Sequence, residues 1–500
     1  MTLNIFFINL YPLISEFFLL LLSCFCLLFG SMLSTSNFKK FPLLNRAIYF
    51  FILQGLLFSF ILLVCASPIF IIFWNKLLIC DSISFYSKFI IIFFAICWVL
   101  IFSHITILNF EFWILILLNI VALAFLLHAY DLLSIYLSIE FLSLIFYILT
   151  SINRISEFST ESGLKYFILG AFASALLLFG FSLLYSFTGL TNLQDFSVFF
   201  TDYSWNYSTN LNFGLLLSII FILSAFLFKL GAAPFHFWLP DVYEGAPNSI
   251  TAWFALLPKL VFLILIIRFI FFAFNNFMMH ELYIYLVFST FLSGLVGTAG
   301  AFLQTKWKRF IAFSSISHLS FFLLILCSFK TDYLIYLFTY LLIYLLMTCT
   351  FFSFFSFITI FKFPNNFNPR FFYSLKFLSL INPPLAGFFS IVLFSFAGIP
   401  PLAGFFSKFF VIYSAISSHF FFLVLALLLL NCISCFYYIR LIRKNYFNQI
   451  EFSYLPVIYS TKQNNNSFIL SSLSVFLILL IFDFDFIFLF ANLLQNAFLS

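Results

Sequence analysis

The stretch that decides the fold is residues 229–268, KLGAAPFHFWLPDVYEGAPNSITAWFALLPKLVFLILIIR. It starts on a lysine that closes a long apolar run, and Gly231 and Pro234 follow within one or two turns. Proline removes a backbone donor and kinks a helix. In lipid, such a break survives only where the freed backbone is buried or lines a wet cavity. The stretch therefore predicts a discontinuous transmembrane helix with Lys229 at the break, followed by a helix that carries Lys259.

A second interruption lies further along the chain, in FSFAGIPPLAGFFSKFFV at residues 394–411, with Lys408 after the two prolines. Interrupted spans that carry charge in corresponding places of two halves are typical of transporters built from repeats. The two breaks lie about five spans apart, and an odd number of helices makes repeats inverted. The chain is therefore predicted to hold two inverted five-helix repeats with two discontinuous helices. We expect a three-helix segment at 1–110, repeats at 111–274 and 275–441, and a loop with a last helix at 442–500.

The composition requires lipid as the solvent. Hydrophobic residues make up 65% of the 500 residues and charged residues only 8%, against about 25% charged in a soluble domain. No P-loop or GxGxxG stands in the chain, which argues against nucleotide or flavin binding, and we expect no nucleic-acid partner. The nine cysteines include the pairs Cys24/Cys26 and Cys432/Cys435. Without a second pair at ligand spacing they are interpreted as buried free thiols and not as a metal site.

Counting the apolar runs predicts an all-α polytopic membrane protein with about 14 transmembrane helices. The predicted spans are 12–33, 47–74, 86–108, 111–130, 132–152, 163–189, 213–239, 248–274, 282–303, 309–329, 333–362, 385–417, 419–441 and 467–493.

The distribution of lysine and arginine among the loops tests the number of spans, because these residues are enriched in the loops on one side of a membrane. Only Lys76, Lys88 and Lys330 fall in one set of loops. The alternate set holds Lys39, Lys40, Arg46, Arg154, Lys306, Lys308, Arg309, Lys362, Arg370, Lys376, Arg440, Arg443, Lys444 and Lys462. We therefore expect both termini outside and the basic loops on the matrix or cytoplasmic side.

Four ionisable residues stand deep inside predicted spans: Glu140, Lys229, Lys259 and Lys408. A charge at the centre of a span costs about 3 kcal/mol on insertion scales. Such residues face a bundle interior and mark ion or proton paths. The alternative is a lysine near a helix end that extends to the interface, and the depth of these four favours a functional interpretation.

Two further cations are nearer to helix ends. Lys165 stands four residues after Glu161, so a simple i,i+4 ion pair competes with a functional role. Arg268 closes its span and is expected to reach the interface or bind lipid.

Two histidines suit a proton relay, because imidazole titrates near neutral pH. His236 follows the first break, and His318 stands in AFSSISHLSFF beside Ser314 and Ser315. A polar contact between helices is the alternative for both. The remaining histidines are near span ends and are expected at the interface: His104, His128, His280 and His419.

The quoted stretch carries the pattern KxxxxPFHxWxPDxYxGxP, followed by TA and PK. It closely resembles the antiporter-like membrane subunits of NADH–quinone oxidoreductase, respiratory complex I, and the chain 2 type most of all. DLLSIYLSIEFLSLIFYIL, KRFIAFSSISHLSFFLLI and FSFAGIPPLAGFFSKFFVI look like the fifth, tenth and discontinuous twelfth helices of that family. The resemblance runs from about residue 112 to 440. Chain 4 types usually place a glutamate where Lys408 stands, and chain 5 types end in a long lateral helix that has no counterpart here.

The resemblance implies a proton path through Glu140, Lys165, Lys229, Lys259 and Lys408, to which His236 and His318 are added here as relay candidates. It implies a subunit of the proton-translocating NADH:ubiquinone reductase that binds no cofactor itself, with NADH, FMN, iron–sulfur clusters and ubiquinone in partner subunits. Expected partners are other membrane-arm subunits, of the chain 4 type and of the small chain 4L, 6 and 3 types, and lipids including cardiolipin. The expected location is the mitochondrial inner membrane.

Three other interpretations stay open. A plastid NADH-dehydrogenase-like chain 2 subunit is similar in sequence. A stand-alone cation/proton antiporter would share most of the motifs. A scaffold subunit would hold the same charges merely as pairs.

Overall fold

The computed structural model describes residues 10–34, 42–103, 110–201, 209–274, 282–362, 365–367, 369–375, 378–447, 458–461, 464–480 and 482–499. Within these residues, twelve helices are long and apolar enough to cross a membrane. The prediction of a polytopic helical membrane protein is therefore confirmed. The chain divides into two compact units: unit 1 holds Met1–Leu230, Leu257–Leu282 and Asn496–Ser500, and unit 2 holds Gly231–Leu256 and Tyr283–Gln495.

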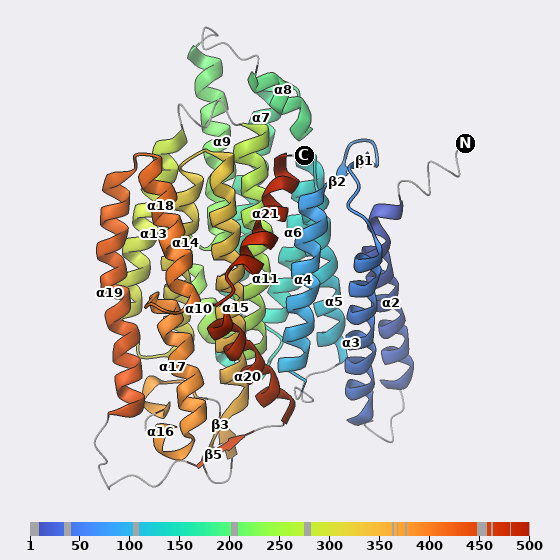
Figure 1. Ribbon diagram of the computed structural model, residues 1–500. Helices are drawn as coiled ribbons and strands as arrows, with labels where there is room; N and C mark the ends of the chain where they lie inside the picture. The colour runs from blue at the N-terminus through green and yellow to red at the C-terminus, as the bar shows by residue number, and fades with distance from the viewer. Residues whose placement is uncertain are drawn as a thin grey trace. The chain divides into compact units, whose positions relative to one another are not determined.

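Unit 1 is a helical bundle in which α7 and α9 run along each other and α5 packs against α2, α4 and α6 (Figure 1). Aspartates set two of the helix starts: Asp81 caps α4 and Asp131 caps α6, each by accepting a backbone N–H with its side chain. The helices of unit 1 are α2 (Ile14–Ser34), α3 (Pro42–Cys65), α4 (Ser82–Ile101), α5 (Phe110–His128), α6 (Leu132–Thr150), α7 (Glu157–Thr188), α8 (Leu193–Thr201) and α9 (Thr209–Leu230), with a 3-10 turn η1 (Tyr11–Leu13).

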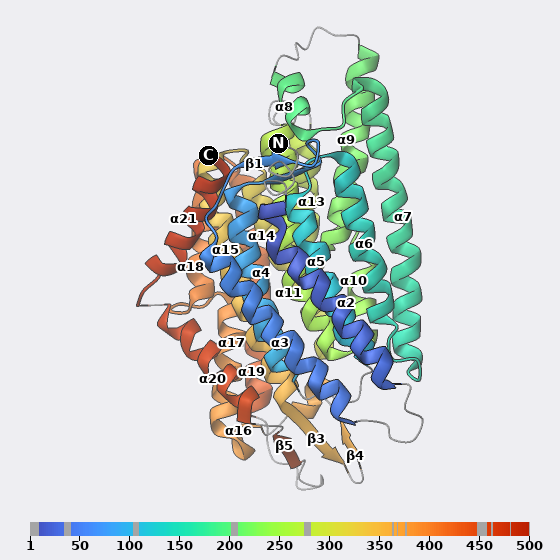
Figure 2. The same cartoon turned by 90° about the vertical axis from the view of Figure 1, so that its right-hand side faces the viewer.

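A short hairpin joins α3 to α4 in unit 1. Its strands β1 (Ile71–Phe73) and β2 (Leu78–Cys80) pair antiparallel, and Leu78 also bridges to Ala129, between α5 and α6. Figure 2 shows the hairpin at the end of the bundle where α2 begins. The predicted span at 47–74 was therefore too long, because the helix ends at Cys65 and the chain becomes extended.

Unit 2 is built on α13 and α14, which pack closely along each other, while α15 packs against α17, α18 and α20. A three-stranded sheet of order β4-β3-β5 covers one end of the unit. Its helices are α10 (Trp238–Gly245), α13 (Tyr283–Leu303), α14 (Trp307–Leu326), α15 (Leu334–Phe357), α16 (Leu378–Ile381), α17 (Pro383–Ala397), α18 (Ala403–Ser417), α19 (Phe421–Tyr446), α20 (Asn464–Leu479) and α21 (Asp485–Leu499), with strands β3 (Ile358–Lys362), β4 (Asn365–Phe367) and β5 (Ile458–Thr461) and 3-10 turns η4 (Thr331–Tyr333) and η5 (Phe372–Leu375). Helix α11 (Asn248–Ile267) crosses from one unit to the other and continues into the π-helical segment η2 (Arg268–Ala273).

Both predicted interruptions are present. Helix α9 ends at Leu230 and α10 resumes at Trp238, while α17 ends at Ala397 and α18 starts at Ala403. Each first half stops at a glycine with a φ of +77°, Gly231 and Gly398, a conformation that costs other residues about 1–2 kcal/mol. A glycine therefore ends each first half, just before its proline.

Two predicted spans were wrong in their extent. The predicted span at 467–493 is two helices, α20 and α21, because the chain leaves helical geometry around Asp483. The span predicted at 333–362 ends as a helix at Phe357, where β3 begins. The strands were missed because short β-branched and aromatic runs beside apolar helices share the composition of the spans.

All nine cysteines are free. Cys26 is buried, but Cys24 and Cys432 are exposed on this chain and Cys435 is half-buried. The prediction that these thiols are buried was wrong for Cys24, Cys65 and Cys432, which are exposed. Thiols are weakly polar and behave as small apolar groups, so a lipid-facing position suits them.

Candidate functional site

Lys229 stands in the last turn of α9, one residue before the helix ends at Leu230. Its side chain is only 8% exposed, and its Nζ has no hydrogen-bond partner. An ammonium group that is buried without acceptors is costly. This lysine is therefore held at the break by the fold and not by bonds to its charged group.

Glu140 lies on α6 of the same unit, three residues before Ser143. The Ser143 hydroxyl donates to Oε2 of Glu140 at 3.4 Å, and Oε1 is buried without a hydrogen-bond partner. No ion pair joins Glu140 to Lys229 among the ion pairs that the described residues form, although the two charges interact electrostatically. The two groups thus lie near each other in unit 1 with a free acceptor on one side and a free donor on the other.

Lys259 lies on α11 directly after Pro258, and its side chain is 5% exposed. The candidate span Asn248–Ala273 is buried throughout its most apolar window. The deep position predicted for Lys259 is therefore observed.

Arg268 does not extend to the interface, so that prediction was wrong. It is buried, and its Nη2 donates to Oδ1 and Oδ2 of Asp81 at 2.6 and 2.7 Å. Nη1 of Arg268 donates to the carbonyl oxygen of Leu127. The planar guanidinium group can hold a carboxylate with parallel bonds, and this fixes η2 against the start of α4.

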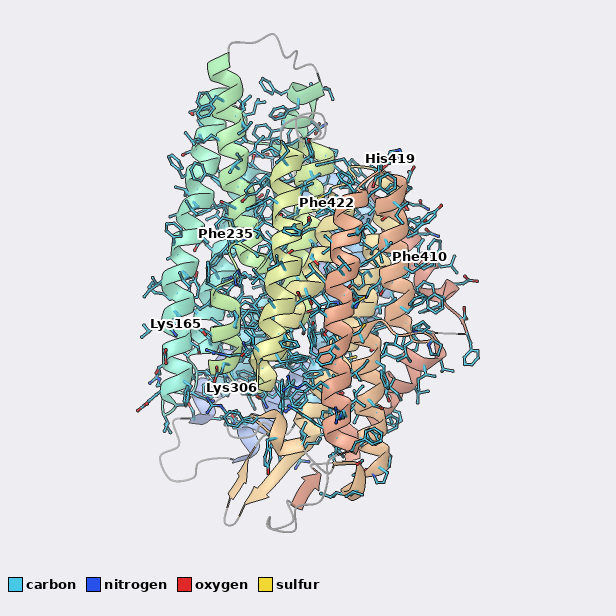
Figure 3. All side chains as sticks on the ribbon, turned by 90° about the vertical axis from the view of Figure 1, so that its left-hand side faces the viewer. Lys165, Phe235, Lys306, Phe410, His419 and Phe422 are labelled. Carbon is cyan, nitrogen blue, oxygen red and sulfur yellow. The ribbon has the colours of Figure 1, made fainter. Side chains whose placement is uncertain are left out.

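Lys165 lies on α7 and points outward from unit 1 (Figure 3). Its side chain is 45% exposed, and its Nζ lies 2.8 Å from Oε1 of Glu161, one helical turn earlier. This is the i,i+4 pair that the sequence offered as the alternative. A role for Lys165 in proton transfer stays a prediction that rests on the resemblance.

Lys408 lies on α18 after the second break, and its environment is unlike that of Lys229. Its Nζ donates to the carbonyl oxygens of Phe396 and Ala397 at 2.9 and 3.0 Å, and to Oδ1 of Asn431 at 2.7 Å. The two carbonyls belong to the last turn of α17, whose C-terminal end carries partial negative charge. Lys408 is therefore bound by the helix end that precedes it, and no carboxylate is needed to hold its charge.

His318 on α14 lies beside Lys408. Its Nδ1 is 2.7 Å from the hydroxyl oxygen of Tyr340, and its ring contacts Phe396 with the centroids 5.5 Å apart. His318 and Lys408 line one cavity of about 10 Å³ together with polar side chains from α13 and α19, among them Thr298 and Asn431. A space of that size holds about one water molecule, so one water could link the imidazole and the ammonium group.

His236 lies between α9 and α10 and is half-buried. Its Nδ1 is buried without a hydrogen-bond partner. Its ring packs against the next residue, Phe237, with the centroids 4.6 Å apart. The structure therefore places a histidine with an open ring nitrogen in the segment that breaks the helix.

An ion network around Glu244, at the end of α10, was missed. Lys306 donates to Oε1 of Glu244, Arg370 Nη2 lies 2.9 Å from the same oxygen, and Arg309 Nε lies 2.5 Å from Oε2. Burial raises the pKa of Glu244, but the hydrogen bonds from Lys306 and Arg370 outweigh it and lower the pKa below its ordinary value. The acidic motif PDVYEG and the basic run KWKR were signals that could have revealed the network.

A second missed cluster joins α2, α4 and α5. Lys88, predicted in a loop, is buried on α4 with its Nζ 3.0 Å from Oε1 of Glu16. His128, predicted at the interface, is fully buried with Nε2 3.3 Å from the same oxygen. The acid within the first apolar run was the signal, because a charge inside a span requires a partner.

The other histidines that were predicted near span ends are His419, which lies at the turn between α18 and α19, and His104 and His280, which are outside the described residues.

Known proteins are similar to this chain in sequence. The family model of the NADH:quinone oxidoreductase/Mrp antiporter transmembrane region matches residues 129–434. NADH-ubiquinone oxidoreductase chain 2 of Marchantia polymorpha is 36% identical over 477 residues, which cover 94% of each chain.

Solved structures agree on the fold. A chain of respiratory complex I from Thermus thermophilus superposes with a TM-score of 0.75 at 24% identity, covering 93% of this chain and 96% of that one. A chain of the Mrp complex from Dietzia superposes with a TM-score of 0.81 at 17% identity, covering 97% of both. The match over most of the chain and the buried charges at two broken helices lead to one conclusion. The chain belongs to the antiporter-like membrane subunits of NADH:quinone oxidoreductase, in the chain 2 branch of that family.

Proposed function

We propose that this chain is a proton-translocating membrane subunit of NADH:ubiquinone oxidoreductase. The observation that carries the proposal is Lys229, a buried ammonium group without a hydrogen-bond partner beside a carboxylate with a free oxygen. A charge in an apolar interior is costly, and a nearby opposite charge offsets that cost. The proton affinity of Lys229 therefore depends on the charge of Glu140.

The proposed switch works through that dependence. While Glu140 is ionised, Lys229 keeps its proton. When the charge of Glu140 is neutralised or drawn away, the desolvated ammonium group releases the proton to a neighbour. Lys259, buried in the same unit, is the proposed acceptor. Because neither Lys229 Nζ nor Glu140 Oε1 is committed to another bond, small movements suffice to open or close the pair.

In unit 2 the proposed carriers are His236, His318 and Lys408. His318 and Lys408 share a cavity of about 10 Å³, so a proton can pass between them through one water molecule. Release from Lys408 requires its bonds to the end of α17 to break. This site is therefore suited to holding a proton until a change at the break frees it.

Quinone reduction supplies the driving energy in partner subunits, where NADH, FMN, iron–sulfur clusters and ubiquinone bind. This chain holds no cofactor in the proposal. It contacts membrane-arm subunits of the chain 4 type and the small chain 4L, 6 and 3 types, and lipids including cardiolipin. Its location is the mitochondrial inner membrane with the basic loops on the matrix side, in line with the loop bias and the similarity to plant chain 2 proteins.

Proton pumping per electron, measured in proteoliposomes that contain the assembled complex, tests the proposal. Lys229→Ala should lower the ratio while NADH-driven quinone reduction continues. Lys76→Ala is the matched control, because Lys76 is an exposed lysine with a loose ion pair to Asp195 at 3.9 Å. An unchanged ratio in Lys229→Ala would show that the lysine has only a structural role, as in a scaffold subunit.

A stand-alone cation/proton antiporter is the alternative that the fold shared with the Mrp chain favours. A native gel of mildly solubilised membranes separates the two. Comigration of this chain with a very large band that stains for NADH dehydrogenase supports the first function. A small assembly without that activity supports the antiporter. A plastid-type complex would be identified by peptides of its other subunits in the same band.

A further inference from the structure

Three ionisable side chains that the proposed function does not use meet in the N-terminal part of unit 1. They are Glu16 on α2, Lys88 on α4 and His128 at the end of α5. Their side chains are 1%, 3% and 0% exposed. The family model begins at residue 129, so this cluster lies outside the region that defines the antiporter-like family.

Hydrogen bonds fix the tautomer of His128. Its Nδ1 lies 2.7 Å from the carbonyl oxygen of Ile79. A carbonyl oxygen can only accept, so Nδ1 must carry a proton that it donates to Ile79. In a neutral imidazole the other nitrogen, Nε2, is then an acceptor with an exposed lone pair.

That lone pair faces another acceptor. Nε2 of His128 lies 3.3 Å from Oε1 of Glu16, and an ionised carboxylate has only acceptors. Two acceptors at this distance attract each other only when a proton lies between them. The proton belongs either to an imidazolium group that donates to Glu16 or to a carboxylic acid that donates to His128.

The neighbouring groups hold Glu16 in place and bring no other acid that would compete for this proton. Lys88 Nζ lies 3.0 Å from the same Oε1 and donates to the carbonyl oxygen of Pro12 at 3.3 Å, while Ser15 donates to Oε2 of Glu16 at 2.7 Å. The nearest other acid, Asp81, is occupied by Arg268. The Cys80 thiol on β2 stays neutral, because burial raises its pKa.

A cavity of about 210 Å³ lies beside the cluster. Lys88, Ser15, Pro12 and Cys80 line it together with residues at and just after the end of α3: Leu62, Leu63, Cys65 and Ala66. It is large enough for several water molecules, and serine, lysine and a carbonyl give them polar partners. Cavity water can therefore reach Glu16 through Lys88 and Ser15, which line the cavity and bond to its carboxylate, whereas Glu16 and His128 do not line the cavity.

We propose that Glu16 and His128 form a second protonatable site, which takes up one proton shared between Oε1 and Nε2 and exchanges it with water in the adjoining cavity. In the uptake step Lys88, which lines the cavity, passes one ammonium proton to Oε1 of Glu16 and takes a proton from a hydronium ion, which remains as water. Lys88 also positions the carboxylate against the imidazole. The site differs from the proposed switch at Lys229, and its existence does not depend on that switch.

Infrared difference spectra of the assembled complex, recorded between mildly acidic and mildly alkaline buffer, test the site. Glu16→Gln keeps the size of the side chain. Its amide nitrogen, at the position of Oε1, can donate to Nε2 of His128, and its oxygen, at the position of Oε2, can accept from Ser15, but it loses the bond from Lys88 and cannot titrate. The carboxyl signal of Glu16 should be present in the wild type and in Lys229→Ala, and lost in Glu16→Gln. If the spectra of wild type and Glu16→Gln coincide, the cluster is a static ion pair and the proposal is wrong.

A second variant answers the same question if Glu16→Gln does not assemble. His128→Asn keeps a donor for the carbonyl oxygen of Ile79 and removes only the Nε2 position. It should abolish the imidazole signal and shift the carboxyl signal of Glu16, and unchanged signals would contradict a shared proton. Transfer into D₂O tests the cavity: the Glu16 signal should shift at once, and a signal insensitive to D₂O would exclude access through the cavity. Loss of the pumping effect of Lys229→Ala would overturn the proposed function alone and leave these spectra unaffected.

Discussion

Each of the two broken helices has a buried lysine close to its break, but the two ammonium groups differ in their hydrogen bonds. At the first break Lys229 stands on the helix that ends, and its ammonium group has no hydrogen-bond partner. At the second break Lys408 stands on the helix that resumes, and its ammonium group donates to three acceptors. A lysine without bonds responds readily to a change in a neighbouring charge, whereas a fully bonded lysine resists it.

The difference extends to what holds each break in place. At the second break, Lys408 itself ties the start of α18 to the carbonyl end of α17. At the first, the segment after the break is held by Glu244 at the end of α10, which contacts Lys306 and Arg309. One break is therefore stabilised by the lysine that is proposed to carry a proton, and the other is stabilised by charges that have no part in the proposed proton transfer.

The largest expected effect is on stability when the two lysines are exchanged for methionine. Lys408→Met leaves the acceptors at Phe396, Ala397 and Asn431 without the ammonium group, and should destabilise the chain by about 3 kcal/mol. Lys229→Met removes a charge that has no hydrogen bonds, but it also leaves Glu140 without its nearby opposite charge, so it should cost less than Lys408→Met and not stabilise the chain. Thermal unfolding of the purified complex in detergent measures both. Equal losses of thermal stability in the two variants would show that the bonds of Lys408 do not stabilise the second break.

A smaller loss is expected when only one acceptor of Lys408 is removed. Asn431→Leu takes away the side-chain oxygen that lies 2.7 Å from Nζ and should cost about 2 kcal/mol, as a hydrogen bond to a charged group does. The double variant with Lys408→Met should lose less than the sum of the two single losses. Full additivity would show that the two side chains do not act as a unit.

Glycine at each break gives a third test. Alanine at Gly398 must adopt a φ of +77° and would place its Cβ 2.9 Å from Cδ of Lys408, so Gly398→Ala should cost about 1–2 kcal/mol and also displace the lysine. Gly231→Ala faces the same backbone strain, with Leu239 as its nearest contact at 2.2 Å. The number of protons pumped per electron distinguishes the two variants, because only Gly398→Ala displaces Lys408 and should lower that number. If both variants lower stability and neither changes pumping, the bonds of Lys408 are irrelevant to its function.

The smallest effect concerns pH and the charges after the first break. The folded pKa of Glu244 is lowered, so its ion pairs stabilise the chain above the unfolded pKa of about 4.3 and are lost as the pH falls through the folded value. The partly exposed cations limit this contribution to about 1 kcal/mol. Thermal stability measured from about pH 5 downward should fall less in Glu244→Gln than in the wild type. If stability falls equally with pH in the wild type and in Glu244→Gln, the ion pairs of Glu244 do not stabilise the segment after the first break.

Sequence predicted the breaks because proline and glycine act locally and leave a clear signature at Pro234 and Pro400. It also predicted the depth of Glu140, Lys229, Lys259 and Lys408, since depth follows from the length of apolar chain on either side. Family membership was predictable for the same reason: the motif around the first break is continuous in sequence.

Partners of charged groups were not predictable, because they come from distant parts of the chain. Arg268 was expected at the interface and instead binds Asp81, and Lys88 was expected in a loop and instead binds Glu16. Nothing local to either cation reveals these acids. The acceptors of Lys408 were equally hidden, since two of them are backbone carbonyls that every residue possesses.

The three oxygens that accept from Lys408 also bear on how this position can change during evolution. Relatives of the chain 4 type usually carry glutamate at this position, and a lysine codon can become a glutamate codon by one base change. In this chain a carboxylate there would face the carbonyl oxygens of Phe396 and Ala397, so acceptors would oppose acceptors, and only Asn431 could turn its amide to donate. That one-step substitution would loosen the helix break before it offered any new chemistry. The lysine and glutamate lineages are therefore separated by a less stable intermediate, unless another side chain first supplies a donor to the carbonyl oxygens of Phe396 and Ala397.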